Sequence, residues 1–215
     1  MSRSSRRALA AAALAVLAGC GADPFGKPAR VKTEGYRALV TARTDGRVTA
    51  SYEIAARGGD VRRASPGGPG PVLLLRGQEH RALWLDPGAR TYTELPWEQA
   101  LAALPAGHPL GAGFDDRVEA DRRGIRAYRR DSDEIFSGHA CALWSFDDRP
   151  GEDGSPLTTY WVAPDLDGLV VRVERKVPRP EGGRSESVTE LTNVRVGADP
   201  ALFEVPKDYV PAPSR

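Results

Sequence analysis

Apolar and polar residues alternate with a period of two through much of this chain. Residues 36–42 place Tyr, Ala, Val and Ala at every second position, and residues 48–54 repeat the pattern with Val, Ala, Tyr and Ile. The segment Thr44-Asp45-Gly46 between them is a hairpin signal. A period of two with one apolar face predicts antiparallel strands that cover a core.

The same pattern, with turn residues between the segments, extends over most of the chain. Further strands are expected at residues 72–75, 82–85, 126–131, 139–147, 157–163, 169–176 and 187–196, and residues 61–64 and 91–95 follow turns. The only persuasive helix beyond the N-terminal segment runs from Trp97 to Leu104, where apolar residues recur at i, i+4 and i+7. We expect about nine or ten strands and one or two short helices. The predicted fold class is mainly β, with one domain built on a single curved antiparallel sheet.

The N-terminus predicts export. Three arginines precede an unbroken apolar run from Ala8 to Ala18, which has the length of the apolar region of a signal peptide and not of a membrane span. Leu17-Ala18-Gly19-Cys20 follows and resembles the lipobox of bacterial lipoproteins. We therefore expect residues 1–19 to be removed and Cys20 to carry the lipid. The alternative is an ordinary signal peptide in which Cys20 is incidental.

Behind Cys20 we expect a tether over residues 20–30, one β domain over 31–210 and a tail over 211–215. Without its signal arginines the chain keeps 27 of 30 basic residues against 29 acidic ones, so no cationic field remains to attract nucleic acid. Cys141 is then the only cysteine besides the acylated one, and no internal disulfide can form. The fold must therefore be held by its hydrophobic core.

Several ordered motifs resemble those of the LolA/LolB-like superfamily of periplasmic lipoprotein carriers. They are residues 83–92 (LWLDPGARTY), 138–141 (GHAC), 160–169 (YWVAPDLDGL), 190–194 (ELTNV) and 202–206 (LFEVP). The resemblance covers roughly residues 31–210. It implies an incomplete β-barrel with helices across its opening and acyl chains carried in an apolar hollow. The N-terminal helical segment and the helix at 97–104 are shorter than in such carriers. Either loops form the lid, for which residues 105–117 are the candidate, or side chains fill the hollow.

Tryptophans are the candidates for the lining of such a hollow. We consider Trp84, Leu85, Trp144 and Trp161 as possible pocket residues, with ordinary sheet core as the alternative for the aromatic side chains. His139 and Cys141 share one face of a strand but lack the second half of a tetrahedral zinc site. A buried, inert Cys141 is the favoured interpretation.

No catalytic constellation is visible in the sequence. There is no Gly-x-Ser-x-Gly motif, no complete calcium loop and no glycine-rich phosphate loop. We expect no enzyme activity, no cofactor and no metal. The sequence favours a membrane-anchored envelope lipoprotein that faces the periplasm and binds a lipid or acyl chain. The alternative is a protein-interaction or envelope-stress-sensing module on the same fold.

Overall fold

The computed structural model describes residues 31–102, 104, 126–129, 134–147 and 155–213. The expected signal peptide, Cys20, the tether and the candidate lid at 105–117 lie outside these residues. No helix among the described residues has the length and apolarity needed to cross a membrane.

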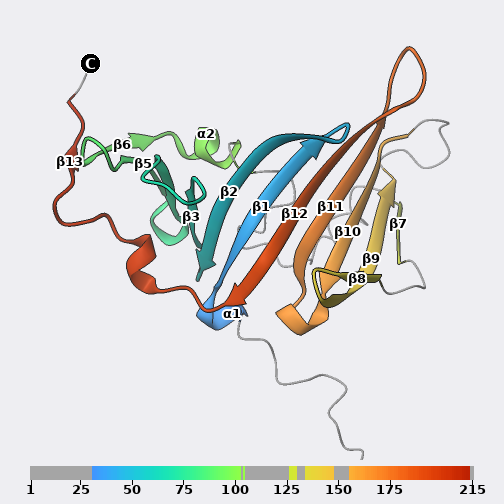
Figure 1. The fold of residues 1–215 in the computed structure, drawn as a ribbon, viewed down its shortest axis with the longest axis horizontal. Helices are drawn as coiled ribbons and strands as arrows, with labels where there is room; N and C mark the ends of the chain where they lie inside the picture. Colours follow the sequence, from blue (N-terminus) through green and yellow to red (C-terminus); the bar gives the residue numbers. More distant parts are fainter. Residues whose placement is uncertain (1–30, 103, 105–125, 130–133, 148–154, 214–215) are drawn as a thin grey trace, which may run out of the picture.

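Strands dominate the described chain (Figure 1). The first half holds β1 (Tyr36–Thr44), β2 (Arg47–Arg57), β3 (Asp60–Ala64), β4 (Val72–Arg76), β5 (Arg81–Asp86) and β6 (Thr91–Leu95). The second half holds β7 (Arg126–Arg129), β8 (Glu134–Phe136), β9 (His139–Asp147), β10 (Leu157–Ala163), β11 (Leu169–Pro178), β12 (Arg184–Val196) and β13 (Val210–Pro211). The helical elements are α1 (Val31–Glu34), α2 (Trp97–Ala102) and the 3-10 turns η1 (Gly77–Glu79), η2 (Pro164–Leu166) and η3 (Pro200–Phe203).

All thirteen described strands belong to one sheet. Its order is β13-β6-β5-β4-β3-β2-β1-β12-β11-β10-β9-β7, and β8 pairs with β9. Two meanders, β1 to β6 and β9 to β12, are joined where β1 pairs with β12. Every pairing is antiparallel except that of β13 with β6. The strands at the two ends of this order are not paired with each other, so the described sheet is open.

The predicted fold class is therefore confirmed: a mainly β chain, one bent antiparallel sheet that is not closed, and two short helices. The hairpin at Thr44-Asp45-Gly46 forms as expected, with Asp45 and Gly46 at positive φ. The helix expected to reach Leu104 ends at Ala102 and closes with a tighter turn, in which the Leu104 amide donates to the Leu101 carbonyl. The count of nine or ten strands was too low, because it left out β3 and β6, of five residues each, and β8 and β13, of three and two.

The larger hydrophobic core lies on the face of the sheet that we call the inner face, defined by Leu73 and Leu75 of β4. These side chains join buried residues from both meanders, including Val40, Ile54, Val61, Ala82, Leu143, Trp161, Val171 and Leu191. Helix α2 lies on this core with Ala100 buried and Trp97, Leu101 and Leu104 packed against it. The apolar stripe expected at 97, 101 and 104 is thus the face that the helix buries.

A second core lies on the opposite, outer face of β3 to β5. It holds Ala55, Ala64, Val72, Leu74, Leu83 and Leu85 from the sheet, together with Ala198 and Phe203 from the chain after β12. We call residues 197–212 the strap, because they cross this face from the end of β12 to the edge of β6 (Figure 1). Strands β3 to β5 are thus covered on both faces, which explains why residues 72–75 are continuously apolar and buried.

The strap is held at both ends by backbone hydrogen bonds. At its start, the Gly197 and Ala198 amides donate to the carbonyls of Gly35 and Glu34, at 2.9 and 2.8 Å. The Arg57 guanidinium also donates to the Ala198 carbonyl at 2.8 Å. At its end, the Val210 and Ala212 amides donate to the carbonyls of Arg90 and Tyr92. Between these attachments, side chains such as Phe203 and Leu202 connect the strap to the sheet.

Candidate functional site

The four residues considered as a pocket lining do not come together. Trp84 and Leu85 are neighbours on β5, and successive side chains of a strand point to opposite faces. Trp84 pairs with Leu73 and is 43% exposed, whereas Leu85 pairs with Val72 and belongs to the outer core. The two residues therefore cannot line one cavity.

The same geometry separates the other two tryptophans. Trp161 is buried in the inner core, and its Nε1 donates to Glu134 Oε2 at 2.9 Å. Trp144 is paired with Tyr160, the neighbour of Trp161, and packs with Val162, Val170 and Val173 on the opposite face of β9 and β10. The structure therefore places these four side chains on different faces of the sheet and does not bring them together in one lining.

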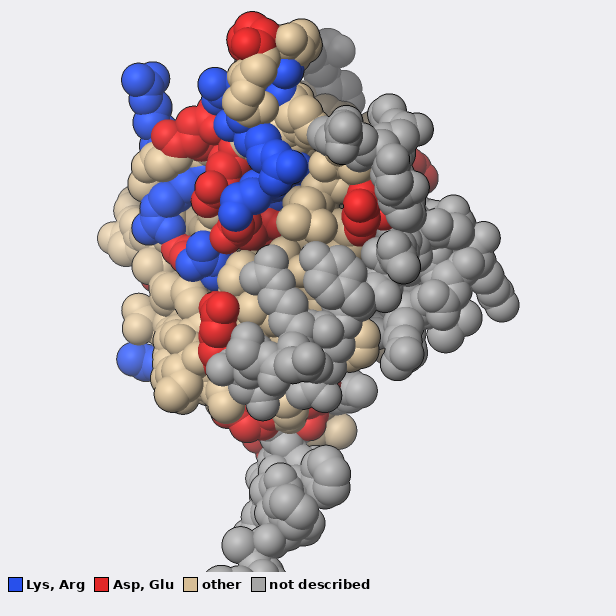
Figure 2. Space-filling view, turned by 90° about the vertical axis from the view of Figure 1, so that its right-hand side faces the viewer, with Lys and Arg blue, Asp and Glu red and all other residues tan. Residues whose placement is uncertain are grey.

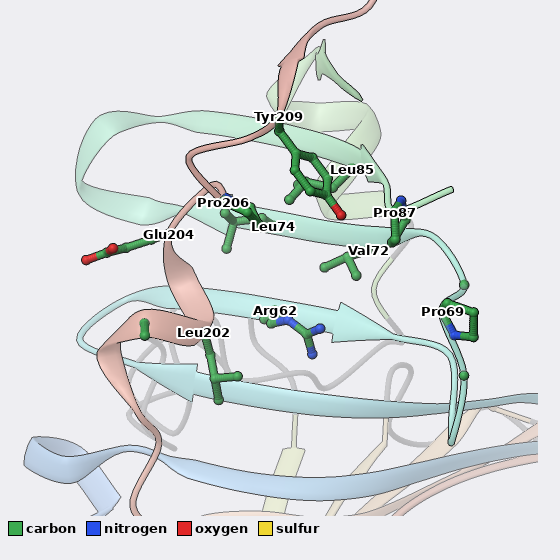
Figure 3. Close-up of a pocket in the computed structure, with 13 residues that line it drawn as sticks. Arg62, Pro69, Val72, Leu74, Leu85, Pro87, Leu202, Glu204, Pro206 and Tyr209 are labelled. Atoms are coloured by element: carbon green, nitrogen blue, oxygen red, sulfur yellow. The ribbon is translucent and has the colours of Figure 1, made fainter. Parts of the chain in front are cut away.

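The structure instead forms a cavity of about 360 Å³ between the outer face and the strap. Figure 3 shows Val72, Leu74 and Leu85 on the sheet side and Leu202, Pro206 and Tyr209 on the strap side. The rim is completed by Arg62, Gly68, Pro69, Gly70, Pro87, Ala201 and Glu204. Of the four predicted lining residues, Leu85 alone lines this cavity.

Local sequence explains why this space is not filled. The loop after β3 and the turn after β5 contribute glycine and proline, whose small or rigid side chains cannot reach across the cavity. The strap crosses the sheet at a distance because the 3-10 turn η3 lies between the start of the strap and Pro206. The Asp199 side chain caps this turn by accepting a hydrogen bond from the Ala201 amide at 3.0 Å. Phe203, the last residue of this turn, inserts into the outer core and holds the strap there. The cavity lies beside that anchor.

Arg62 is the basic residue at this site. It is half-buried on β3, directly opposite Leu74 on β4 and Ala55 on β2, so it stands among apolar outer-face residues. Burial lowers the pKa of the Arg62 guanidinium, the charge of Glu53 opposes that shift, and the charge of Arg37 adds to it. An arginine remains protonated in spite of such a shift. No hydrogen bond or ion pair to the Arg62 guanidinium is formed within the described part of the chain.

The two titratable side chains that the sequence singled out, His139 and Cys141, are engaged in local contacts. His139 Nδ1 lies 2.7 Å from Asp165 Oδ2, and Cys141 is fully buried in the inner core, as expected from the strand pattern. Among the described residues, no group of three or more His, Cys, Asp or Glu side chains is placed to hold a metal ion.

Charged side chains of both signs lie side by side on the second meander. Arg172 bonds to Glu190 at 3.0 Å and to Glu174 at 3.1 Å, and its guanidinium stacks over the Trp161 ring at 4.8 Å. Burial raises the pKa of Glu174, but its bonds to Lys176 and Arg172 outweigh that effect and lower it. Figure 2 shows acidic and basic side chains intermingled on this side of the molecule. On this side of the described chain, charges of one sign do not form an extended field.

The strap is the part of the site that sequence reasoning missed. The signal was present in Leu202-Phe203-Glu204-Val205-Pro206, an apolar segment after the last long strand. Such a segment needs a face to cover, and the continuous apolar run at 72–75 needs a cover on its second face. Matching the two would have predicted the contact.

The comparisons with known proteins show similarity of fold only. No family model matches the chain, and no curated protein matches it. Similar solved structures include MucB, with 12% identity, a TM-score of 0.46 and coverage of 86% of this chain. The chain spans 61% of the length of that MucB structure. A LolA superfamily protein, NE2245 from Nitrosomonas europaea, matches with 11% identity, a TM-score of 0.35 and coverage of 82% of this chain and 94% of that one.

A third solved structure is a DUF1329 family protein from Desulfovibrio piger. It matches with 17% identity, a TM-score of 0.33 and coverage of 81% of this chain and 92% of the other. A LolA superfamily member is thus among the similar structures. Likenesses at these scores carry no assignment of ligand or partner, which must come from the residues of this chain.

Proposed function

We propose that the protein is a membrane-anchored lipoprotein of the cell envelope that binds an acyl chain or a similar apolar ligand, without catalysis. The observation that supports this function is the cavity under the strap, where aliphatic side chains of the sheet face aliphatic and aromatic side chains of the strap. Its volume of about 360 Å³ lies in the range of small-molecule sites, which are mostly apolar with a few placed polar groups. The ligand site proposed here is this strap cavity, not a hollow inside the curve of the sheet.

Anchoring is proposed from the sequence, through the signal peptide and Cys20. Changing Cys20 to Ala removes the thiol that accepts the lipid. We expect the variant to accumulate as an uncleaved or mislocalised precursor that incorporates no labelled fatty acid, while the wild-type protein is labelled and fractionates with membranes. A variant that is still matured and still acylated would show that another residue carries the lipid.

Ligand binding is tested by filling the cavity from the strap side. Leu202→Trp places a larger side chain at a half-buried lining position, so we expect saturable binding of a fluorescent fatty acid to fall by about tenfold or more. The matched control is Val210→Trp, which adds the same side chain at an exposed strap position outside the lining. Near-ultraviolet circular dichroism would verify that both variants fold.

The interaction-module alternative predicts a different result. If the folded wild-type chain binds no apolar probe saturably, or if Leu202→Trp binds as the wild type does, the strap cavity is not a lipid site. The envelope lipoprotein would then be better explained as an anchored platform for another protein.

A further inference from the structure

We propose that the strap cavity is specific for single-chain amphiphiles with an anionic head group, a carboxylate or a phosphate monoester, and that Arg62 binds this head group. The inference rests on the proposed function, because it takes the strap cavity as the ligand site. It adds the chemical class of the ligand and the residue that selects it.

Arg62 lies among aliphatic side chains on the outer face of the sheet. Arg62, Leu74 and Leu83 form one cross-strand row on the outer face, and Ala64, Val72 and Leu85 form the next. The Arg62 guanidinium therefore lies beside the aliphatic outer-face side chains of β4 and β5. Figure 3 shows the Arg62 side chain below Val72 and Leu74, with its guanidinium directed toward the Pro69 side of the cavity. An apolar chain lying on Val72 and Leu85 can thus place its head group beside Arg62.

Two arginines and one acidic residue determine the charge near the Arg62 side of the cavity. Arg37 lies on the same face as Arg62, because each of them is paired with Ala55 from one side of β2. Glu53 is the nearby acid whose charge acts on Arg62, and it offsets one of the two positive charges. Glu204, the acid at the rim, points away from the cavity on the side opposite the Arg62 guanidinium (Figure 3). The site therefore presents a positive group to a ligand.

Energetics favour an anion over a neutral or cationic ligand. A partly desolvated guanidinium loses water contacts that only an acceptor can replace, and carboxylate or phosphate oxygens match its donors in pairs. A hydroxyl head group supplies a weaker, uncharged acceptor, and a quaternary ammonium head group would be repelled. The aliphatic floor and the strap side chains Leu202 and Tyr209 take up the tail in every case. Head-group chemistry therefore decides the ranking of ligands of equal chain length.

The test compares ligands that share one tail. Isothermal titration would measure dodecanoate, dodecyl phosphate and dodecyltrimethylammonium below their micellar concentrations, dodecanol below its solubility limit, and inorganic phosphate. The protein is the chain from Gly21 to Arg215, which keeps the whole sheet, both helices and the strap. We expect the two anionic amphiphiles to bind about 10- to 100-fold more tightly than dodecanol, as one charge-assisted interaction allows. Inorganic phosphate, which lacks a tail, should not bind measurably.

Variants identify the residue. Arg62→Met should reduce dodecanoate affinity to that of dodecanol and leave dodecanol binding unchanged, and Arg62→Lys should restore part of the preference. The matched control Arg47→Met removes an exposed arginine at the start of β2, far from the lining, and should change neither affinity. The ligand comparison on the wild-type chain needs no variant, so it decides the question even if Arg62→Met fails to fold.

The outcomes separate the two proposals. Equal binding of dodecanoate and dodecanol by the wild-type chain would overturn the head-group assignment and leave apolar binding intact. A preference for anions that Arg62→Met does not reduce would remove Arg62 from the site. Tight binding of inorganic phosphate would identify a small-anion site instead of an amphiphile site. No binding of any tailed probe would overturn the proposed function itself.

Discussion

Phe203→Ala is expected to lower the free energy of unfolding by about 3–5 kcal/mol, the usual cost of truncating a buried phenylalanine. Phe203 is 5% exposed and inserts into the outer core together with Leu74, Leu83 and Leu85. It is the largest side chain that the strap buries there. Its removal leaves a void under a segment that is otherwise held by hydrogen bonds at its two ends and by partly buried side chains such as Leu202 and Tyr209. Denaturant unfolding followed by tryptophan fluorescence measures the loss.

The same variant should also bind apolar probes poorly, because Leu202 and Tyr209 lie on either side of the anchor and form the outer wall of the cavity. The matched control is Val210→Ala on the same strap, at a residue that is 58% exposed. Its effect should stay within about 0.5 kcal/mol, as for most surface changes. If Phe203→Ala proved as mild as Val210→Ala, the strap would not be held by the outer core.

The local parts of this fold could be predicted because their signals are local. Alternation at 36–42 and 48–54, interrupted by Thr44-Asp45-Gly46, determines the β1–β2 hairpin within about twenty residues of sequence, and the structure has it there. The stripe at Trp97, Leu101 and Leu104 likewise determines which side of α2 faces the core. In both cases the interacting residues are close neighbours in the chain.

The non-local parts could not be predicted in this way. Pairing of β1 with β12 joins residues near Val40 to residues near Leu191, and no turn chemistry lies between them to indicate the register. The parallel pairing of β13 with β6 involves two residues and leaves almost no pattern. Such long-range pairings are stabilised by the apolar area that whole faces of the sheet bury together. A short segment of sequence does not contain that information.

The candidate site illustrates a further limit. Trp84 and Leu85 were both apolar and adjacent, and strand parity alone shows that they cannot face one cavity. Parity does not show which of the two faces carries the ligand. That depended on the strap, which arrives from residues more than a hundred positions away. Arg62 was unremarkable in sequence, because nothing near it indicates that its neighbours across the sheet are Leu74 and Ala55.

Gly35→Ala is expected to destabilise the fold by about 2–5 kcal/mol, from a left-handed backbone and a steric clash together. Gly35 has φ +76°, and a Cβ built on it would lie 2.2 Å from the Ala56 carbonyl oxygen. The oxygen belongs to β2, which is paired on both sides and cannot move aside. Gly35 also accepts the Gly197 amide, so a shift of this backbone would loosen the start of the strap.

The variant Gly46→Ala separates the effect of the left-handed backbone from that of the steric clash. Gly46 has nearly the same φ, +78°, but its added Cβ would meet no atom within 4 Å. That variant should therefore lose only the conformational part, about 1–2 kcal/mol. The difference between the two free energies of unfolding, measured under identical denaturant conditions, reports the clash at Ala56. Equal losses would mean that the chain between α1 and β1 lies farther from β2 than the structure places it, and that the attachment of the strap at Gly197 does not depend on that contact.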